Sequence, residues 1–128
     1  MTYQATDIKI SKTTIDTVNK ILSEWGCSKK ERLSLLGVSE QEHKLISTCS
    51  ELIAFNIGLR KRVSYILAIY ECLSTIFNNP ENRNGFLKLN NEANLFNGST
   101  PMIYIMADGT AKALENVYLY LKEMWLPS

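Results

Sequence analysis

The chain has 128 residues, of which 45% are hydrophobic, 21% charged and 9% aromatic, and its formal net charge is +1. These values indicate one compact domain or two very small ones with a hydrophobic core, and they exclude global disorder. They also show no global basic excess of the kind that nucleic-acid binders carry. No window is apolar enough to span a membrane, and residues 1–12 lack the apolar segment of a secretory signal, so we expect a cytoplasmic protein without membrane contact.

Helical periodicity dominates the sequence, and no strand pattern of period two persists beyond three or four residues. The chain is therefore expected to be all-α. A loose arm over 1–12 is followed by helices predicted over 13–25, 29–36, 40–49, 59–77, 80–88, 102–107 and 111–125. Gly58 is expected to interrupt the chain before the long fourth helix, and the Asn-rich segment 89–98 is expected to form a loop.

Hydroxyl and amide side chains stand where the predicted helices begin. Ser28 is followed by Glu31 and Ser39 by Glu42, which is the spacing of a capping box. Pro80 follows two asparagines and suits a first helical position. Thr110, after a glycine, is expected to cap the last helix.

The inventory of reactive side chains argues against an enzyme. His43 is the one histidine, and Cys27, Cys49 and Cys72 are widely spaced, so we predict reduced, partly buried cysteines and no metal site. The glycines do not cluster into a phosphate-binding loop, and the carboxylates stand mostly in first turns of helices. We expect neither catalytic residues nor a cofactor.

The second and third predicted helices, joined by Gly37-Val38, have the layout of a helix-turn-helix. Two interpretations stay open, a scaffold and a DNA-binding unit, because Glu40 and Glu42 would face the phosphates. The candidate DNA contacts are Lys29, Lys30, Arg32, Ser39, Gln41 and Lys44. The basic run 60–62 opens the long helix against its dipole, which indicates either an anionic partner or a solvated face.

The C-terminal half carries the most specific pattern. The run Arg62-Val63-Ser64-Tyr65-Ile66-Leu67-Ala68-Ile69-Tyr70 is followed by Phe77-x-x-Pro80-Glu81, and then by Phe96-Asn97-Gly98-Ser99-Thr100-Pro101 before a short apolar segment that ends at Gly109. In order and spacing these motifs resemble the Xre/MbcA/ParS antitoxin family, and the segments 25–28 and 35–39 resemble that family's N-terminal region. The resemblance covers about residues 13–125, with Asn79 where the family often has Asp.

The resemblance implies a type II antitoxin that binds a RES-domain toxin, blocks its NAD site, and often represses its own operon as a dimer. It implies an Xre-like helix-turn-helix domain over 1–58, joined by a long helix to a C-terminal toxin-binding domain over 59–128. Apolar and aromatic residues beyond what short helices bury internally are typical of an interface. The candidate toxin contacts are Leu95, Phe96, Gly98, Pro101, Ile103, Met106, Trp125, Leu126, Pro127 and Ser128.

Two other functions fit the same pattern. One is a helix-turn-helix transcriptional regulator with a C-terminal dimerisation domain, whose DNA affinity would fall with salt. The other is a scaffold or immunity protein whose target is not a RES enzyme.

Overall fold

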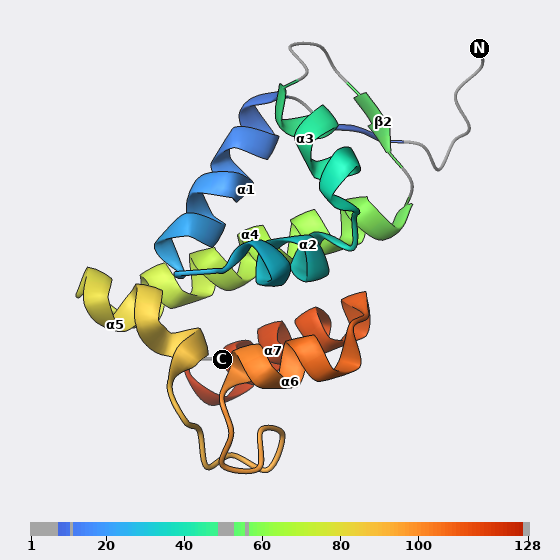
Figure 1. Ribbon diagram of the computed structural model, residues 1–128. Helices are drawn as coiled ribbons and strands as arrows, with labels where there is room; N and C mark the ends of the chain where they lie inside the picture. The colour runs from blue at the N-terminus through green and yellow to red at the C-terminus, as the bar shows by residue number, and fades with distance from the viewer. Residues whose placement is uncertain (1–7, 11, 49–52, 56, 127–128) are drawn as a thin grey trace.

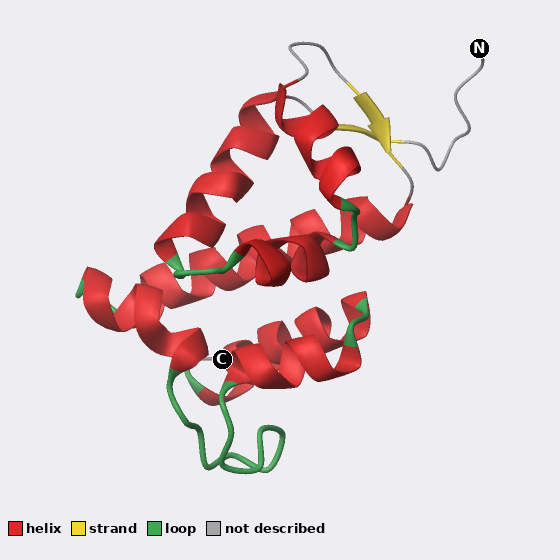
Figure 2. Ribbon diagram, in the orientation of Figure 1, coloured by secondary structure: helices red, strands yellow, loops and turns green. Residues whose placement is uncertain are grey.

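The computed structural model of the protein describes residues 8–10, 12–48, 53–55 and 57–126. It confirms the all-α class, because the regular secondary structure of the described residues is helical except for one short two-stranded ribbon (Figure 2). The α-helices are α1 (Lys12–Glu24), α2 (Lys29–Leu36), α3 (Glu40–Thr48), α4 (Ile57–Ile76), α5 (Pro80–Gly85), α6 (Pro101–Asp108) and α7 (Ala111–Met124), and a 3₁₀ turn, η1 (Phe86–Lys88), follows α5.

Helix α4 runs through the middle of the molecule (Figure 1). Helices α1 and α3 lie on one side of it and α6 with α7 on the other, while α5 extends beyond its end. Helix α2 lies across α4 in this view and contacts both α4 and α6. Apart from the helix expected over 80–88, the predicted helix positions are confirmed to within one or two residues, because most starts have a capping or proline signal and the apolar residues have helical spacing.

A short two-stranded ribbon is the feature that the sequence pattern did not predict. Strand β1 (Ile8–Ile10) pairs antiparallel with β2 (Ile53–Phe55), with Lys9 opposite Ala54. The expected loose arm is therefore wrong over 8–10. Three residues give too little alternation for a period-two signal, and the pairing joins segments more than 40 residues apart in the sequence.

Three local expectations are corrected. Helix α4 begins at Ile57 and continues through Gly58, which a first turn tolerates. The single helix expected over 80–88 is an α-helix followed by the turn η1. Thr110 occupies the N-cap position of α7 without a side-chain cap bond, and its hydroxyl donates to Asp108.

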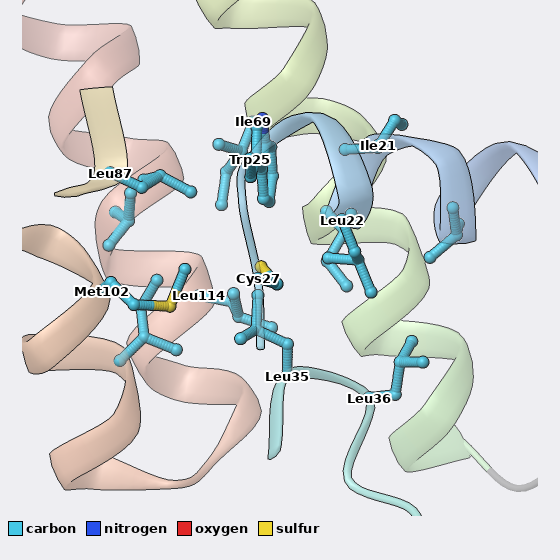
Figure 3. Close-up of a cluster of buried hydrophobic side chains, with 14 of the residues drawn as sticks. Ile21, Leu22, Trp25, Cys27, Leu35, Leu36, Ile69, Leu87, Met102 and Leu114 are labelled. Atoms are coloured by element: carbon cyan, nitrogen blue, oxygen red, sulfur yellow. The ribbon is translucent and has the colours of Figure 1, made fainter. Parts of the chain in front are cut away.

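One continuous cluster of buried apolar side chains holds the fold together. Figure 3 shows Trp25, which follows α1, meeting Leu35 of α2, Ile69 of α4, Met102 of α6 and Leu114 of α7 in it. The cluster draws on both sides of the predicted domain boundary at residue 58, which itself stays a prediction. Cys27 and Cys72 are unpaired and buried, as predicted, and Cys49 lies outside the described residues. Burial, as the largest cause, raises the pKa of Cys27 to about 11.

Arg62 of α4 joins the C-terminal ends of two other helices. Its guanidinium donates to the carbonyl oxygens of Ser34 at 2.9 Å and Leu35 at 3.3 Å in α2, and to that of Gly109 at 2.9 Å, which caps α6. The last carbonyls of a helix have no partner within it and carry the negative end of its dipole. The basic run 60–62 was expected to face an external anion or solvent, but the guanidinium of Arg62 is bound within the fold.

Gly37 makes room for this arrangement. It ends α2 in the left-handed region, with φ of +66°, and a Cβ added to it would lie 2.6 Å from Nε of Arg62. The guanidinium could move away only by giving up its carbonyl partners. Glycine is therefore required here for its backbone conformation and for its lack of a side chain.

We predict that Arg62→Ala lowers the free energy of unfolding by about 2–3 kcal/mol, because it leaves helix-terminal carbonyls without their charged donor. Arg60→Ala, in the same turn but exposed, is the matched control and should stay within about 0.5 kcal/mol of the parent. Urea unfolding followed by circular dichroism measures both. Equal stability of the two variants would contradict the structural role of Arg62.

A second prediction separates the two requirements at Gly37. Gly26 also has a positive φ, of +71°, but a Cβ there would meet nothing within 4 Å. Gly26→Ala should therefore cost only the left-handed strain, about 1–2 kcal/mol, and Gly37→Ala should cost roughly 1–3 kcal/mol more through displacement of Arg62. When both glycine substitutions are made in an Arg62→Ala background, the difference between their free energies of unfolding should largely disappear in the same measurement.

Candidate protein-binding surface

Exposed apolar side chains gather in the C-terminal half of the described chain. Large hydrophobic residues that remain exposed there are Leu89, Ile103, Leu119, Met124 and Trp125. Outside this half, Leu45 of α3 is the one other example among the described residues. An apolar concentration of this kind on a small helical protein marks a contact surface.

The loop between η1 and α6 is closed on itself by backbone hydrogen bonds. The amide of Asn91 donates to the carbonyl of Ser99 at 2.8 Å, and the amide of Gly98 donates back to Asn91 at 2.9 Å. Within this closure, Asn91 Oδ1 accepts from the amide of Ala93 at 2.9 Å. The Asn-rich segment expected to be a loop is thus an ordered one with a defined shape.

Aromatic rings pin this loop to α6 and α7. Phe96 is buried and meets Tyr104 and Tyr120 edge to face, with ring centroids 5.6 and 5.2 Å apart. The hydroxyl of Tyr120 accepts from Trp125 Nε1 at 3.3 Å and lies 3.5 Å from Asn91 Nδ2. Tyr120 is therefore held by its ring on one side and by its hydroxyl on the other.

Two hollows flank Tyr120. One, of about 420 Å³, has Leu95, Leu119 and Met124 as its main apolar walls. The other, of about 350 Å³, has Leu89 and Trp125 on its walls and is also lined by two aromatic rings of the core. We call this region the Tyr120 surface, defined by Leu89, Leu95, Leu119, Tyr120, Met124 and Trp125.

The candidate toxin contacts fall into three groups. Leu95 and Trp125 line the hollows of the Tyr120 surface. Phe96 and Pro101 are buried, so they support the surface from within. The other candidate contacts that the structure describes do not line these hollows. Leu126 borders a different hollow beside Cys72, and Ile103 and Met106 lie on α6. Gly98 takes part through its backbone amide, which closes the loop. Pro127 and Ser128 lie outside the described residues.

Sequence reasoning missed Leu89, Leu119, Tyr120 and Met124. On α7, Leu114, Val117 and Leu121 are buried in the core, whereas Leu119 and Met124 on the same helix are exposed. A second stripe on the same helix could have indicated this surface. Positions 116, 119, 120 and 123 have helical spacing, and all four line the larger of the two hollows.

The α2–α3 pair is the second candidate site. Lys29 forms an ion pair with Glu40, and Arg32 donates to Ser23 Oγ at 2.9 Å and to the carbonyl of Cys27 at 3.2 Å. Ser39 is occupied by its capping box with Glu42. Of the six candidate DNA contacts, Lys30, Gln41 and Lys44 remain exposed and without a partner among the described residues.

His43 has a packing role between α1 and α3. Its Nε2 is hydrogen-bonded to Asn19 Oδ1 at 2.9 Å, and Asn19 Nδ2 donates to Ser47 Oγ at 3.0 Å. It lines a hollow of about 380 Å³ with Cys27, Lys29 and Arg32. Burial, and next the charge of Arg32, lower the pKa of His43 below its ordinary value of 6.5.

The chain matches no protein-family model, and no curated protein is significantly similar to it. Helices long and apolar enough to cross a membrane are missing from the described residues. The described His, Cys, Asp and Glu side chains form no group that could hold a metal ion.

We predict that the protein loses stability as the pH falls below about 6.5 through His43. Its pKa is lowered in the folded state, so the unfolded chain binds the proton first and acid favours unfolding. The single histidine gives one pair of imidazole C–H signals in proton NMR, whose titration midpoint should lie below that of a model peptide. His43→Gln should flatten the stability profile in this pH range, and an unshifted midpoint would contradict the packing role.

Proposed function

We propose that this protein is an antitoxin-type inhibitor that binds a RES-domain toxin through the Tyr120 surface and blocks the toxin's NAD site sterically. The observation that carries the proposal is the Tyr120 surface itself. Leu89, Leu119, Met124 and Trp125 on this surface are exposed, yet its loop is closed by backbone bonds and its central ring is fixed. A surface ordered before binding loses little entropy when a partner docks.

The motifs that carry the family resemblance support this proposal through their structural roles. Arg62 binds the end of α6, and Tyr65 at the start of the same motif donates to Glu115 of α7 at 3.1 Å. Asn79 caps α5, and Thr100 caps α6 by accepting from the amide of Ile103 at 3.0 Å. These residues hold α4, α6 and the loop in the arrangement that presents the Tyr120 surface.

The alternative is a helix-turn-helix regulator, with or without the inhibitor function. The α2–turn–α3 layout favours it, and the pairing of Lys29 with Glu40 removes one of the two carboxylates from the path of a phosphate. The same pair also uses one of the expected cations. A homodimer with two such units would supply the basic residues that a single chain lacks, and salt-dependent binding to the DNA upstream of its gene would support this function.

We predict that the chain restores growth and cellular NAD when co-expressed with a RES-domain protein encoded beside it. Met124→Asp should abolish the rescue, because it places a charge on an apolar contact whose side chain is 69% exposed and so is not needed for folding. Leu45→Asp is the matched control, since Leu45 is 67% exposed but lies on α3.

Rescue lost with Leu45→Asp and kept with Met124→Asp would place the contact on α3 and contradict the Tyr120 surface as the binding site. A neighbouring product that leaves growth and NAD unchanged, or one that the parent chain fails to neutralise, would overturn the inhibitor function. Circular dichroism of both variants checks that each remains folded.

A further inference from the structure

The charges on the Tyr120 surface are all of one sign. Among the residues that line its two hollows, Glu123 at the larger and Glu92 at the smaller are the only ones with charged side chains. Neither takes part in an ion pair with a described residue. The nearest lysine in the sequence, Lys122, lies over the ring of Tyr118 and lines the separate hollow beside Cys72.

We propose that the segment of the partner that docks here is basic and apolar. It places one apolar side chain in each hollow, on either side of Tyr120, and pairs lysine or arginine residues with Glu92 and Glu123. This inference rests on the proposed function for the identity of the partner, and it adds the chemistry by which that partner is recognised.

Desolvation is the physical reason why the docking segment should carry positive charge. Docking an apolar segment removes water from both hollows and from the carboxylates at their edges, which is costly unless a cation replaces that water. A neutral or acidic segment would leave both carboxylates unpaired, whereas a basic segment compensates them and is also steered toward the surface before contact.

The geometry of Tyr120 is the reason for two anchors rather than one. Tyr120 lines both hollows and is fixed by the edge-to-face contact of its ring with Phe96 and by the hydrogen bond from Trp125 to its hydroxyl. A docked segment cannot push it aside without breaking both contacts. The hollows, of about 420 and 350 Å³, each have room for an apolar side chain of the partner without displacement of the ring.

The test measures the affinity of the purified RES-domain neighbour for the parent chain and for charge variants by titration calorimetry at low and high salt. Glu92→Lys and Glu123→Lys should each weaken binding about tenfold or more, and Glu92→Gln and Glu123→Gln by roughly two- to fivefold. Glu71→Lys is the matched control on α4, beside the separate hollow, and should leave the affinity unchanged. The parent affinity should fall with salt, and the double lysine variant should lose most of that dependence.

The outcomes separate the two proposals. If Met124→Asp abolishes binding while the lysine variants bind like the parent, the basic partner is overturned and the inhibitor function stands. If the RES-domain protein does not bind the parent chain at all, the proposed function fails, and a displayed library of random peptides then tests the surface by itself. Peptides enriched on the parent and lost on the double lysine variant should carry lysine or arginine next to apolar residues, and enrichment of neutral or acidic peptides would overturn the inference.

Discussion

The three hydrogen bonds of Arg62 set the arrangement on which the rest of the structure depends. They bring the C-terminal ends of α2 and α6, two helices that contact each other, to the same guanidinium. Lys88 makes a second connection between the N-terminal and C-terminal halves of the chain, because its ammonium group donates to the carbonyl of Gly26 at 2.8 Å and to Glu31 at 2.9 Å. The helix-turn-helix-like part and the Tyr120 surface are thus held by cations at helix ends as well as by the shared core.

This arrangement has a consequence for binding. Helices α6 and α7 supply walls and supports of the Tyr120 surface, and α6 is held at its end by Arg62. A change at Arg62 therefore acts on a surface that it does not touch, through the position of α6. The loop that completes the surface is fixed independently, by its own backbone closure and by Phe96. Rigidity of both parts is what an inhibitor by occlusion requires, since an ordered surface spends less binding free energy on its own ordering.

The fold could be predicted from the sequence wherever the signal is local. Both capping boxes form as their spacing predicts, and the apolar stripes of α1, α4 and α7 face the core. The role of Arg62 could not be predicted, because its partners lie 27 to 47 residues away in the chain and are backbone carbonyls, which every residue has. The ribbon was missed for the related reason that three residues carry no period.

The candidate site was predicted in part for a different reason. Leu95 and Trp125 were identified because the segment around them holds more apolar residues than short helices bury. Leu119 and Met124 were not, because they flank the buried stripe of α7 and only the fold of the loop decides whether a flank is covered. Phe96 and Pro101, equally apolar, went into the core. Composition gave the number of surplus apolar residues in this region but not which of them face solvent.

The distribution of charge favours the C-terminal half as the functional end of the molecule. Three carboxylates of α2 and α3 are bonded within the chain: Glu31 by Lys88 and Ser28, Glu40 by Lys29, and Glu42 by the amide of Ser39. The hydrogen bond from Ser39 holds the pKa of Glu42 below its usual value, which is the sign of a carboxylate already committed to the fold. Glu92 and Glu123, in contrast, stand beside apolar hollows without an ion-pair partner among the described residues. Carboxylates without an ion-pair partner contribute little to the stability of the fold. Next to exposed apolar side chains, they favour binding to a partner of opposite charge.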